Sequence, residues 1–281
     1  MEKVRNLRLL RERVDAARLS HNTVGFVPTM GAIHEGHLSL VHLARAECAL
    51  VVVSIFVNPL QFGPGEDFQR YPRRPEQDAL SLEQSGVDLL YMPDPRELYP
   101  SDFSTSVEVA GVSEGGEGSV RPAHFRGVAT VVAKLFLQVL PDVAYFGRKD
   151  LQQVAVVRRM VRDLDFPIRL VVAETVREPD GLAMSSRNAY LAPFERQQAS
   201  ALPRSLFAAR DLARRGERDP DVLEKLTQGE LEKAGLAVDY VEVVDCTTMR
   251  RPGRVEPGVA LTAAVRFGKT RLIDNVLLLE E

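Results

Sequence analysis

Two histidines three residues apart, His34 and His37, are the first side chains whose type and spacing suggest chemistry. Zinc motifs that place two histidines on one helix usually separate them by four residues. Gly36 lies between the two, and glycine disfavours a helix interior by about 1 kcal/mol relative to alanine. A loop that turns into a helix fits better, and a helix start can bind phosphate through its unpaired NH groups. Zinc, phosphate and a chance pair remain as interpretations.

The elements around this pair indicate an α/β architecture. Strand-like apolar runs alternate with helical patterns over the first two thirds of the chain, which predicts a Rossmann-like, doubly wound parallel sheet covered by helices on both faces. The connections should be right-handed. The strand-like runs are 23–27, 50–57, 87–91, 143–146 and 168–172. The helical patterns run to about 46 and over 75–85, 127–139 and 151–162.

Three regions depart from this alternation. Residues 1–19 carry Val4, Leu7, Leu10 and Val14 at helical spacing and are interpreted as a surface helix. Residues 93–125 are rich in proline and glycine; 104–110 is a possible strand, and the stretch as a whole is a possible mobile flap.

After residue 188 come two helical patterns, with AARDLARRGERDPD between them, and then three strand-like runs. This order predicts a small separate α+β domain. We therefore divide the chain into a nucleotide- and substrate-binding domain at 1–176 and a C-terminal domain at 177–281 that closes over the site.

Composition limits the function classes. The chain has 281 residues, 45% of them hydrophobic and 27% charged, as expected of a globular protein. Its net charge is −3, so the chain has no overall positive charge that would attract nucleic acid. The most apolar stretch, 48–57, is too short to cross a membrane. Cys48 and Cys246 are the only cysteines, so a reducing cytoplasm is the expected location.

Polar residues follow four of the predicted strands, where ligands of open parallel sheets bind. Each group also has a simpler interpretation: Asn58-Pro59 is a common turn, Asp150 suits a helix cap, and Ser185-Ser186-Arg187 suits a capping turn. The four groups are PTMGAIHEGH at 28–37, NPLQFG at 58–63, GRKD at 147–150 with Gln153, and AETVREPDGLAMSSRNAYL at 173–191.

The inventory of these groups favours phosphate chemistry. The chain has no serine elbow, no cysteine beside a histidine and no Walker-type loop. It offers cations, hydroxyl groups and helix NH groups. These hold a triphosphate and stabilise charge on phosphorus during transfer.

Five motifs resemble the pantothenate synthetases, in the same order along most of residues 24–192. A C-terminal RLIDNV is similar too. The five motifs are PTMGAIHEGHLSL, NPLQFGPGEDFQRYPR, RPAHFRGVATVVAKL, GRKDLQQ and REPDGLAMSSRNAYL. Members of this family belong to the nucleotidylyltransferase superfamily. They use ATP to join pantoate to β-alanine, releasing AMP and pyrophosphate through a pantoyl-adenylate intermediate.

The resemblance assigns site residues. It implies that His34, His37 and Lys149 are catalytic, with His37 as proton donor and Lys149 facing the α-phosphate. It implies that Gln61 and Gln153 hold pantoate, with Asn58, Tyr71, Arg121 and His124 nearby for pantoate or β-alanine. The residues implied to bind ATP are Met30, Gly31, Ala32, Ile33, His34, Glu35, Gly36, His37, Gly147, Arg148, Lys149, Asp150, Val176, Met184, Ser185, Ser186 and Arg187.

The resemblance also implies Mg²⁺ with ATP and a homodimer. Asp78 matches a magnesium contact of the family, although Gln77 and Ser81 beside it depart from the usual pattern. Arg148 also replaces the acidic or amide residue common in other members. The apolar run 51–57 and the helix 128–140 are candidate parts of a dimer interface. No membrane or nucleic-acid partner is expected.

Three other functions are compatible with parts of the sequence. A cytidylyl- or adenylyltransferase of the same superfamily would keep the histidine pair but lack the side-chain amides of Gln61 and Gln153 that are expected to bind pantoate. A regulatory nucleotide-binding module would not need Lys149, His37 and a hydroxy-acid pocket together. A dinucleotide dehydrogenase would require Gly-x-Gly-x-x-Gly at the first strand-to-helix turn, which is absent from the sequence.

Overall fold

The computed structural model describes residues 1–280 and divides the chain into two compact units. The chain passes from one unit to the other several times. The first unit comprises Met1–Val109, Arg121–Arg148 and Val156–Glu174, and the second comprises Ala110–Val120, Lys149–Ala155 and Thr175–Glu281.

The first unit is built on a six-stranded sheet in the order β1-β4-β3-β2-β5-β6. All of its strand pairs are parallel, as predicted from the apolar runs. Parallel strands are buried on both faces, which is why these segments read as continuous runs of valine, leucine and isoleucine. The strands are β1 (Glu2–Val4), β2 (Val24–Thr29), β3 (Leu50–Ile55), β4 (Leu89–Tyr91), β5 (Val143–Gly147) and β6 (Arg169–Ala173).

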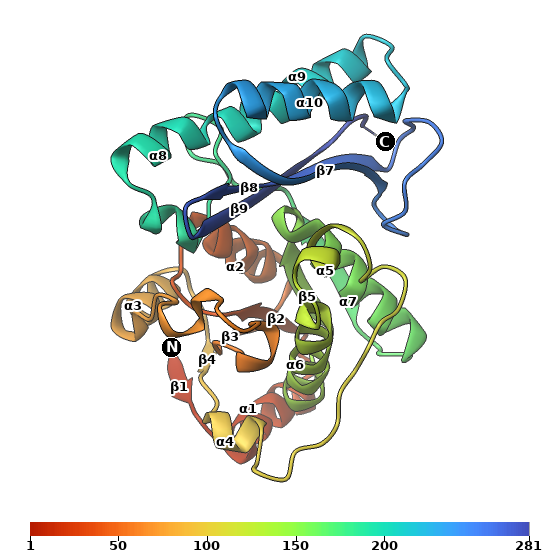
Figure 1. Ribbon diagram of the computed structural model, residues 1–281. Coiled ribbons are helices and arrows are strands. Elements are labelled where there is room, and N and C mark those ends of the chain that lie inside the picture. The colour runs from red at the N-terminus through yellow and green to blue at the C-terminus, as the bar shows by residue number, and fades with distance from the viewer. Residues whose placement is uncertain (281) are drawn as a thin grey trace. The chain divides into compact units, whose positions relative to one another are not determined.

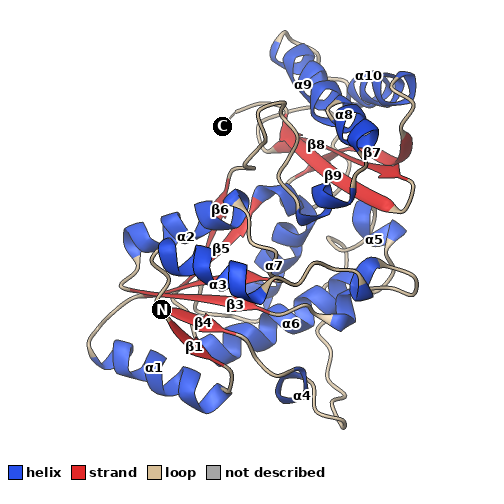
Figure 2. Ribbon diagram, turned by 90° about the vertical axis from the view of Figure 1, so that its left-hand side faces the viewer, coloured by secondary structure: helices blue, strands red, loops and turns tan. Residues whose placement is uncertain are grey.

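Helices cover both faces of this sheet (Figures 1 and 2). On one face α2 (Glu35–Glu47) and α3 (Pro75–Gln84) enclose a core that includes Val27 and Val53. On the other face α1 (Leu7–Leu19) packs against α6 (His124–Val139), and both contact β2. The remaining helices around this sheet are η1 (Pro59–Gln61), η2 (Asp67–Gln69), α4 (Pro95–Leu98), η3 (Arg148–Asp150) and α7 (Leu151–Asp163), and α7 runs from the second unit into the first.

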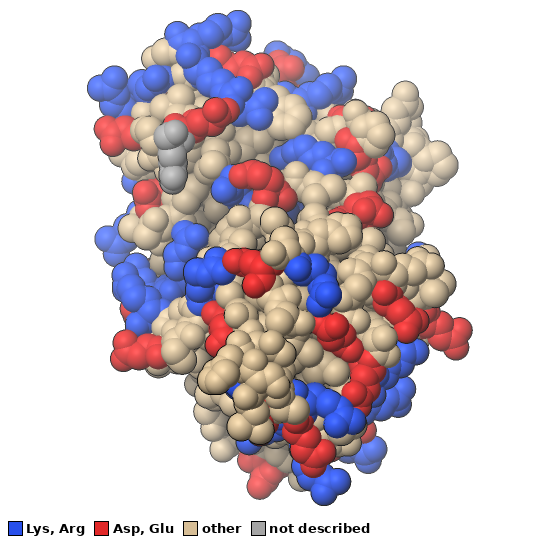
Figure 3. All heavy atoms as spheres, turned by 180° about the vertical axis from the view of Figure 1, so that it is seen from behind, with Lys and Arg blue, Asp and Glu red and all other residues tan. Residues whose placement is uncertain are grey.

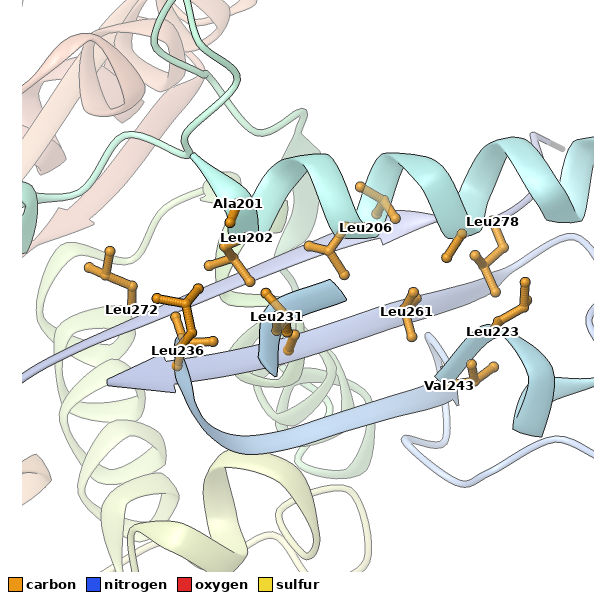
Figure 4. Packing of buried hydrophobic residues seen from close by; sticks show 14 of the residues in the cluster. Ala201, Leu202, Leu206, Leu223, Leu231, Leu236, Val243, Leu261, Leu272 and Leu278 are labelled. Atoms are coloured by element: carbon orange, nitrogen blue, oxygen red, sulfur yellow. The ribbon is translucent and has the colours of Figure 1, made fainter. Parts of the chain in front are cut away.

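The second unit contains an antiparallel sheet in the order β7-β8-β9. Helices α9 and α10 cover one face of it, and leucines from both helices meet leucines of the strands in the core shown in Figure 4. Its elements are α5 (Gly116–Val120), η4 (Ser186–Tyr190), α8 (Pro193–Ala199), α9 (Ala201–Arg214), α10 (Pro220–Lys233), β7 (Ala237–Asp245), β8 (Val259–Phe267) and β9 (Thr270–Leu277). The predicted combination of a doubly wound sheet with a smaller α+β part is confirmed.

The N-terminal prediction was wrong in one respect. The surface helix begins only at Leu7, because the preceding residues form β1, an edge strand paired with β4. Val4 is fully buried in that strand. Asn6 separates the two elements, and its side chain caps α1 by accepting a hydrogen bond from the NH of Leu9. Val4 therefore belongs to the sheet, although its spacing from Leu7 suits a helix.

Two further sequence interpretations need correction. Residues 104–110 form no strand; the NH of Val107 is instead bound by the hydroxyl group of Thr130. The segment AARDLAR lies inside α9 rather than between two helices. Within the apolar run 51–57, Val51, Val52 and Val53 are fully buried in β3 between β4 and β2, whereas Ile55 and Val57 are partly exposed.

On the face shown in Figure 3, lysine and arginine side chains are interspersed with aspartate and glutamate. Among the residues described, no helix combines the length and apolarity required to cross a membrane.

Candidate functional site

The loop after β2 lies where the strand order of the first unit's sheet reverses. From β2 the chain continues to β3 on one side, whereas β5 flanks β2 on the other side. Because all strands are parallel, the segments that follow β2, β3, β5 and β6 leave the same edge of the sheet. Such a reversal point is the usual ligand-binding position in open α/β sheets.

The loop itself has an unusual backbone conformation. Gly31 and Ala32 both have positive φ angles, of 82° and 52°. The hydroxyl group of Thr29 accepts a hydrogen bond from the NH of Gly31 at 3.1 Å. The carboxylate of Asp78 accepts hydrogen bonds from the NH groups of Ala32 at 2.9 Å and Ile33 at 2.8 Å. This network holds a turn that delivers the chain to the start of α2.

His34 and His37 form the N-terminal cap of α2. His34 has an extended backbone before the first helical residue, Glu35, so the two histidines do not share a helical face. The Nδ1 of His34 accepts from the NH of Gly36 at 3.1 Å, and the Nδ1 of His37 accepts from the NH of His34 at 3.3 Å. A neutral imidazole whose Nδ1 accepts carries its proton on Nε2. Each ring therefore has a donor nitrogen suited to a phosphate oxygen.

The number of possible metal ligands near His34 and His37 does not favour the zinc interpretation. The two imidazole rings lie with centroids 4.1 Å apart. Within residues 1–280 no group of three or more histidine, cysteine, aspartate or glutamate side chains is arranged to hold a metal ion. A closed zinc site needs four ligands and a catalytic one needs three. Of the three interpretations, the geometry favours a phosphate-binding helix start.

A buried amide pair follows β3. Asn58 and Gln61 are 1% and 8% exposed, and the Asn58 amide donates to the Gln61 side-chain oxygen at 3.2 Å. The same amide donates to the carbonyl of Gly127 at 3.1 Å. The Gln61 amide nitrogen lies 3.0 Å from the sulfur of Met30, the first residue of the loop after β2. Asn58 also caps η1, as its turn interpretation predicted.

Helix α6 approaches this turn so closely that only glycine fits at the contact. A Cβ atom added to Gly127 would lie 2.2 Å from the carbonyl oxygen of Leu60. Real Cβ atoms do not approach backbone so closely, so either η1 or α6 would have to move. The position of Gln61 therefore depends on the absence of a side chain at residue 127.

Arg121 and His124 contact the main chain of Gln61. His124 Nδ1 lies 2.8 Å from the Gln61 carbonyl, and Arg121 donates to that carbonyl at 3.2 Å. Arg121 also forms a two-point ion pair with Glu66, at 2.9 and 2.7 Å. Burial alone would raise the pKa of Glu66, but the hydrogen bond and positive charge of Arg121 outweigh this and lower it. Tyr71 is buried nearby, with its ring 5.9 Å from that of Phe62.

The segment after β5 is divided between the units. In the first unit, Arg148 follows Gly147 and its guanidinium pairs with the carboxylate of Glu174. In the second unit, the amine of Lys149 lies 3.5 Å from the carboxylate of Asp150, the residue before α7. Gln153 lies on the first turn of α7 and is half-buried.

Also in the second unit, residues 176–187 form a hairpin followed by a capped turn. The NH of Met184 donates to the carbonyl of Val176 at 3.0 Å. Ser185 caps η4 by accepting from the NH of Arg187 at 3.3 Å, with Ser186 as the first residue of that helix. The capping interpretation of this motif is thus confirmed.

Several residues that organise these segments were missed in the sequence. Asp274 is fully buried and accepts both guanidinium bonds of Arg177, at 2.6 and 2.9 Å. Burial raises the pKa of Asp274, whereas the Arg177 charge opposes that change. Asn275 donates to the carbonyl of Lys149 at 2.9 Å. The RLIDNV motif contains both Asp274 and Asn275, but spacing alone does not reveal their partners.

Comparison with known proteins assigns nearly the whole chain to one family. The family model described as Pantoate-beta-alanine ligase matches residues 2–277. A pantothenate synthetase from Paramagnetospirillum magneticum is 50% identical over 273 residues, covering 97% of this chain and 96% of the relative. One from Heliobacterium modesticaldum is 54% identical over 258 residues, covering 91% of this chain and 92% of the relative.

Solved structures extend the similarity to the fold. The crystal structure of pantothenate synthetase from Thermus thermophilus has a TM-score of 0.93 and 48% identity, with 99% of both chains covered. A pantoate-beta-alanine ligase from Francisella tularensis, crystallised with beta-gamma ATP and beta-alanine, has a TM-score of 0.82 and 32% identity over 99% of this chain and 98% of the other. By sequence over nearly its whole length and by fold, the chain belongs to the pantoate-beta-alanine ligase family.

Proposed function

We propose that this protein joins pantoate to β-alanine with ATP, through a pantoyl-adenylate intermediate. The observation that carries the proposal is the contact between the Gln61 amide and Met30. It brings a buried side chain suited to a hydroxy acid next to a loop and helix start suited to phosphates. Family membership supplies the reaction, and this contact supplies a physical reason why the two substrates meet.

The nucleotide is assigned to the loop and helix start of the first unit. Its phosphates would accept hydrogen bonds from the Nε2 protons of His34 and His37 and from the first NH groups of α2, where the helix dipole favours negative charge. The further nucleotide contacts proposed from family resemblance are Gly147, Arg148, Lys149, Asp150, Val176, Met184, Ser185, Ser186 and Arg187. In the first step a pantoate carboxylate oxygen attacks the α-phosphorus, and the bond from that phosphorus to pyrophosphate breaks.

Pantoate needs alignment rather than a base in that step. Its carboxylate is already ionised at neutral pH, so excluding water and fixing the angle of attack lower the barrier. Gln61 and Gln153 would hold its hydroxyl groups and carboxylate. We give Arg121 and His124 a supporting role, because both contact the Gln61 carbonyl. Lys149 would stabilise the charge that develops on the α-phosphate, and His37 would donate a proton to the departing oxygen.

The second step transfers the acyl group. The amine nitrogen of β-alanine attacks the carbonyl carbon of the adenylate, the carbon-oxygen bond to AMP breaks, and the ammonium group formed loses its proton. AMP carries away the electron pair of the broken bond. The structure of the Francisella tularensis relative is described as a complex with β-alanine, which supports the same acceptor here.

Magnesium is proposed as a partner of the ATP phosphates rather than of the protein. Mg²⁺ prefers six oxygen ligands and commonly takes them from phosphates and water. The only carboxylate assigned to it, Asp78, accepts two backbone NH groups and is 3% exposed. We therefore propose no magnesium site held by Asp78, and no step proposed above passes through one.

Pyrophosphate exchange tests the first step directly. Labelled pyrophosphate should enter ATP when magnesium and pantoate are present and β-alanine is omitted. Exchange without pantoate, or no exchange by protein that binds ATP, would contradict the proposal. Alanine in place of Gln61 or Gln153 should raise the pantoate KM more than it weakens ATP binding. The opposite pattern would instead favour another nucleotidyltransferase reaction.

The proposal includes three further properties: a homodimer, closure of the C-terminal domain and a cytoplasmic location. A homodimer would appear in light scattering as twice the chain mass of 31.2 kDa. Closure of the C-terminal domain on ligand binding would appear as compaction in small-angle scattering when ATP and pantoate are added. A cytoplasmic location would appear in cell fractionation.

A further inference from the structure

Asp78, on α3, holds the loop after β2 through two consecutive backbone NH groups. Asp78 is 3% exposed, and each carboxylate oxygen accepts one hydrogen bond: Oδ2 from the NH of Ala32 at 2.9 Å and Oδ1 from the NH of Ile33 at 2.8 Å. We infer that Asp78 is a positioning residue for the phosphate-binding loop rather than a magnesium ligand. This inference rests on the proposed assignment of the ATP phosphates to that loop and helix start.

The loop needs such support because of its backbone conformation. Ala32 has a φ of 52°, in the left-handed region that residues with a Cβ atom rarely occupy. Strained residues persist only where the surrounding structure holds them, and they are concentrated at functional sites. Two charge-assisted hydrogen bonds, from the NH groups of Ala32 and Ile33 to the Asp78 carboxylate, stabilise this conformation. Gly31, with a φ of 82°, is fixed from the other side by Thr29.

The conformation of the loop sets the direction of the chain into α2. Ile33 immediately precedes His34, the cap residue whose own Nδ1 is fixed by the NH of Gly36. Without the bond to Ile33, the loop could return to an ordinary negative-φ conformation and turn both histidines away. A displacement of about 1 Å at a positioning group can cost a hundredfold in rate. Asp78 therefore acts on the nucleotide through the loop.

The chain contains a matched control for this arrangement. Asp88 also binds a backbone NH through its carboxylate, that of Val51 at 2.8 Å, and it pairs with Arg45. It does so next to the first residues of β3, at the edge of the sheet opposite the loop. Replacing Asp88 by asparagine therefore makes the same chemical change away from the proposed nucleotide site.

The test compares Asp78→Asn with Asp88→Asn in the full chain. An asparagine at residue 78 keeps the shape but accepts only one of the two NH groups and opposes the other with its own NH₂. At saturating magnesium, Asp78→Asn should raise the ATP KM by ~10-fold, the effect of losing one hydrogen bond to a charged group. The magnesium concentration for half activation and the KM for β-alanine should not change. Asp88→Asn should leave all three constants unchanged.

Other results would overturn the inference. A rise in the magnesium requirement, with a normal ATP KM once magnesium is saturating, would make Asp78 a metal ligand. A lower Tm with an unchanged ATP KM would make its role structural only. Failure of the wild-type chain to exchange pyrophosphate would instead contradict the proposed function.

A second variant keeps the test informative if Asp78→Asn alone does not fold. Glycine adopts positive φ without strain, so Ala32→Gly lowers the cost of the loop conformation. The double variant Ala32→Gly with Asp78→Asn should therefore bind ATP more tightly than Asp78→Asn, or should fold where the single variant does not. If glycine at residue 32 brings neither improvement, backbone strain is not what Asp78 offsets.

Discussion

The side-chain amide of Asn275 donates a 2.9 Å hydrogen bond to the main-chain carbonyl of Lys149, which lies 126 residues earlier in the chain. Its neighbour on β9, Asp274, binds the guanidinium group of Arg177. Arg177 in turn follows Val176, a residue proposed to contact the nucleotide. Asn275 thus holds the backbone of Lys149, and Asp274 holds the side chain of Arg177 beside Val176. These two contacts give the RLIDNV motif a physical role.

Removal of the Asn275 side chain should impair catalysis through Lys149. Asn275→Ala leaves the Lys149 carbonyl without this donor, and we expect a loss of stability of about 1–3 kcal/mol with a fall in kcat of roughly tenfold or more. The pantoate KM should change little. Asn6→Ala is the control, since it removes the cap of α1 at a cost of about 1 kcal/mol. Equal kcat values for the two variants would show that Lys149 does not depend on Asn275.

Gly127 should tolerate no side chain, in contrast to another helical glycine. In Gly127→Ala the new Cβ would meet the Leu60 carbonyl, so η1 must shift and carry Gln61 with it. We expect a lower Tm and a higher pantoate KM, both measurable in one preparation. Gly229, in α10, has no atom within 4 Å of an added Cβ. Gly229→Ala should therefore raise stability by up to about 1 kcal/mol through helix propensity and leave KM unchanged. A pantoate KM for Gly127→Ala equal to that of the wild type would contradict the positioning argument.

The contrast between Val27 and Val4 shows how much of the fold the sequence predicts. Val27 lies in a continuous apolar run, and such runs, separated by helical patterns, indicate a buried parallel sheet. Val4 is equally buried, but β1 has only three residues and two of them are charged. Its strand character comes from pairing with β4, 87 residues later, which no local pattern reveals.

The same distinction applies to the candidate site. His34, Asn58 and Gln61 follow predicted strands, so the rule for parallel sheets was enough to select them. Asp78 lies in the first turn of α3 and Asn275 lies within β9. The family resemblance drew attention to Asp78 and to the RLIDNV motif, but neither the resemblance nor the local pattern reveals the backbone groups that these two side chains bind. Their roles depend on hydrogen bonds to residues 46 and 126 positions earlier.

The Glu66 carboxylate should contribute stability that disappears in acid. Its pKa is lowered by Arg121, so the folded state favours the ionised form more than the unfolded chain does. That contribution is complete above the unfolded pKa, near 4.3, and is lost as the pH falls through the folded value. Glu66→Gln should therefore cost about 1–2 kcal/mol at pH 7 and progressively less below pH ~4. Thermal unfolding across this range measures the difference.

Gln152, adjacent to the proposed substrate residue Gln153, should control the mobility of residues 112–117. Its amide nitrogen donates to the carbonyls of Val112 at 3.1 Å and Glu114 at 2.9 Å, and its oxygen accepts from the NH of Glu117 at 3.0 Å. These bonds secure part of the stretch that its composition suggested as a mobile flap.

Hydrogen exchange distinguishes a secured segment from a mobile one. In the wild type the Glu117 NH should exchange slowly, because it is buried and bonded, whereas amides near the exposed Ser104 should exchange fast. Gln152→Ala should speed exchange across 112–117 and leave residues around Ser104 unchanged. If 112–117 already exchanges as fast as the region of Ser104 in the wild type, the whole stretch is mobile and Gln152 does not restrain it.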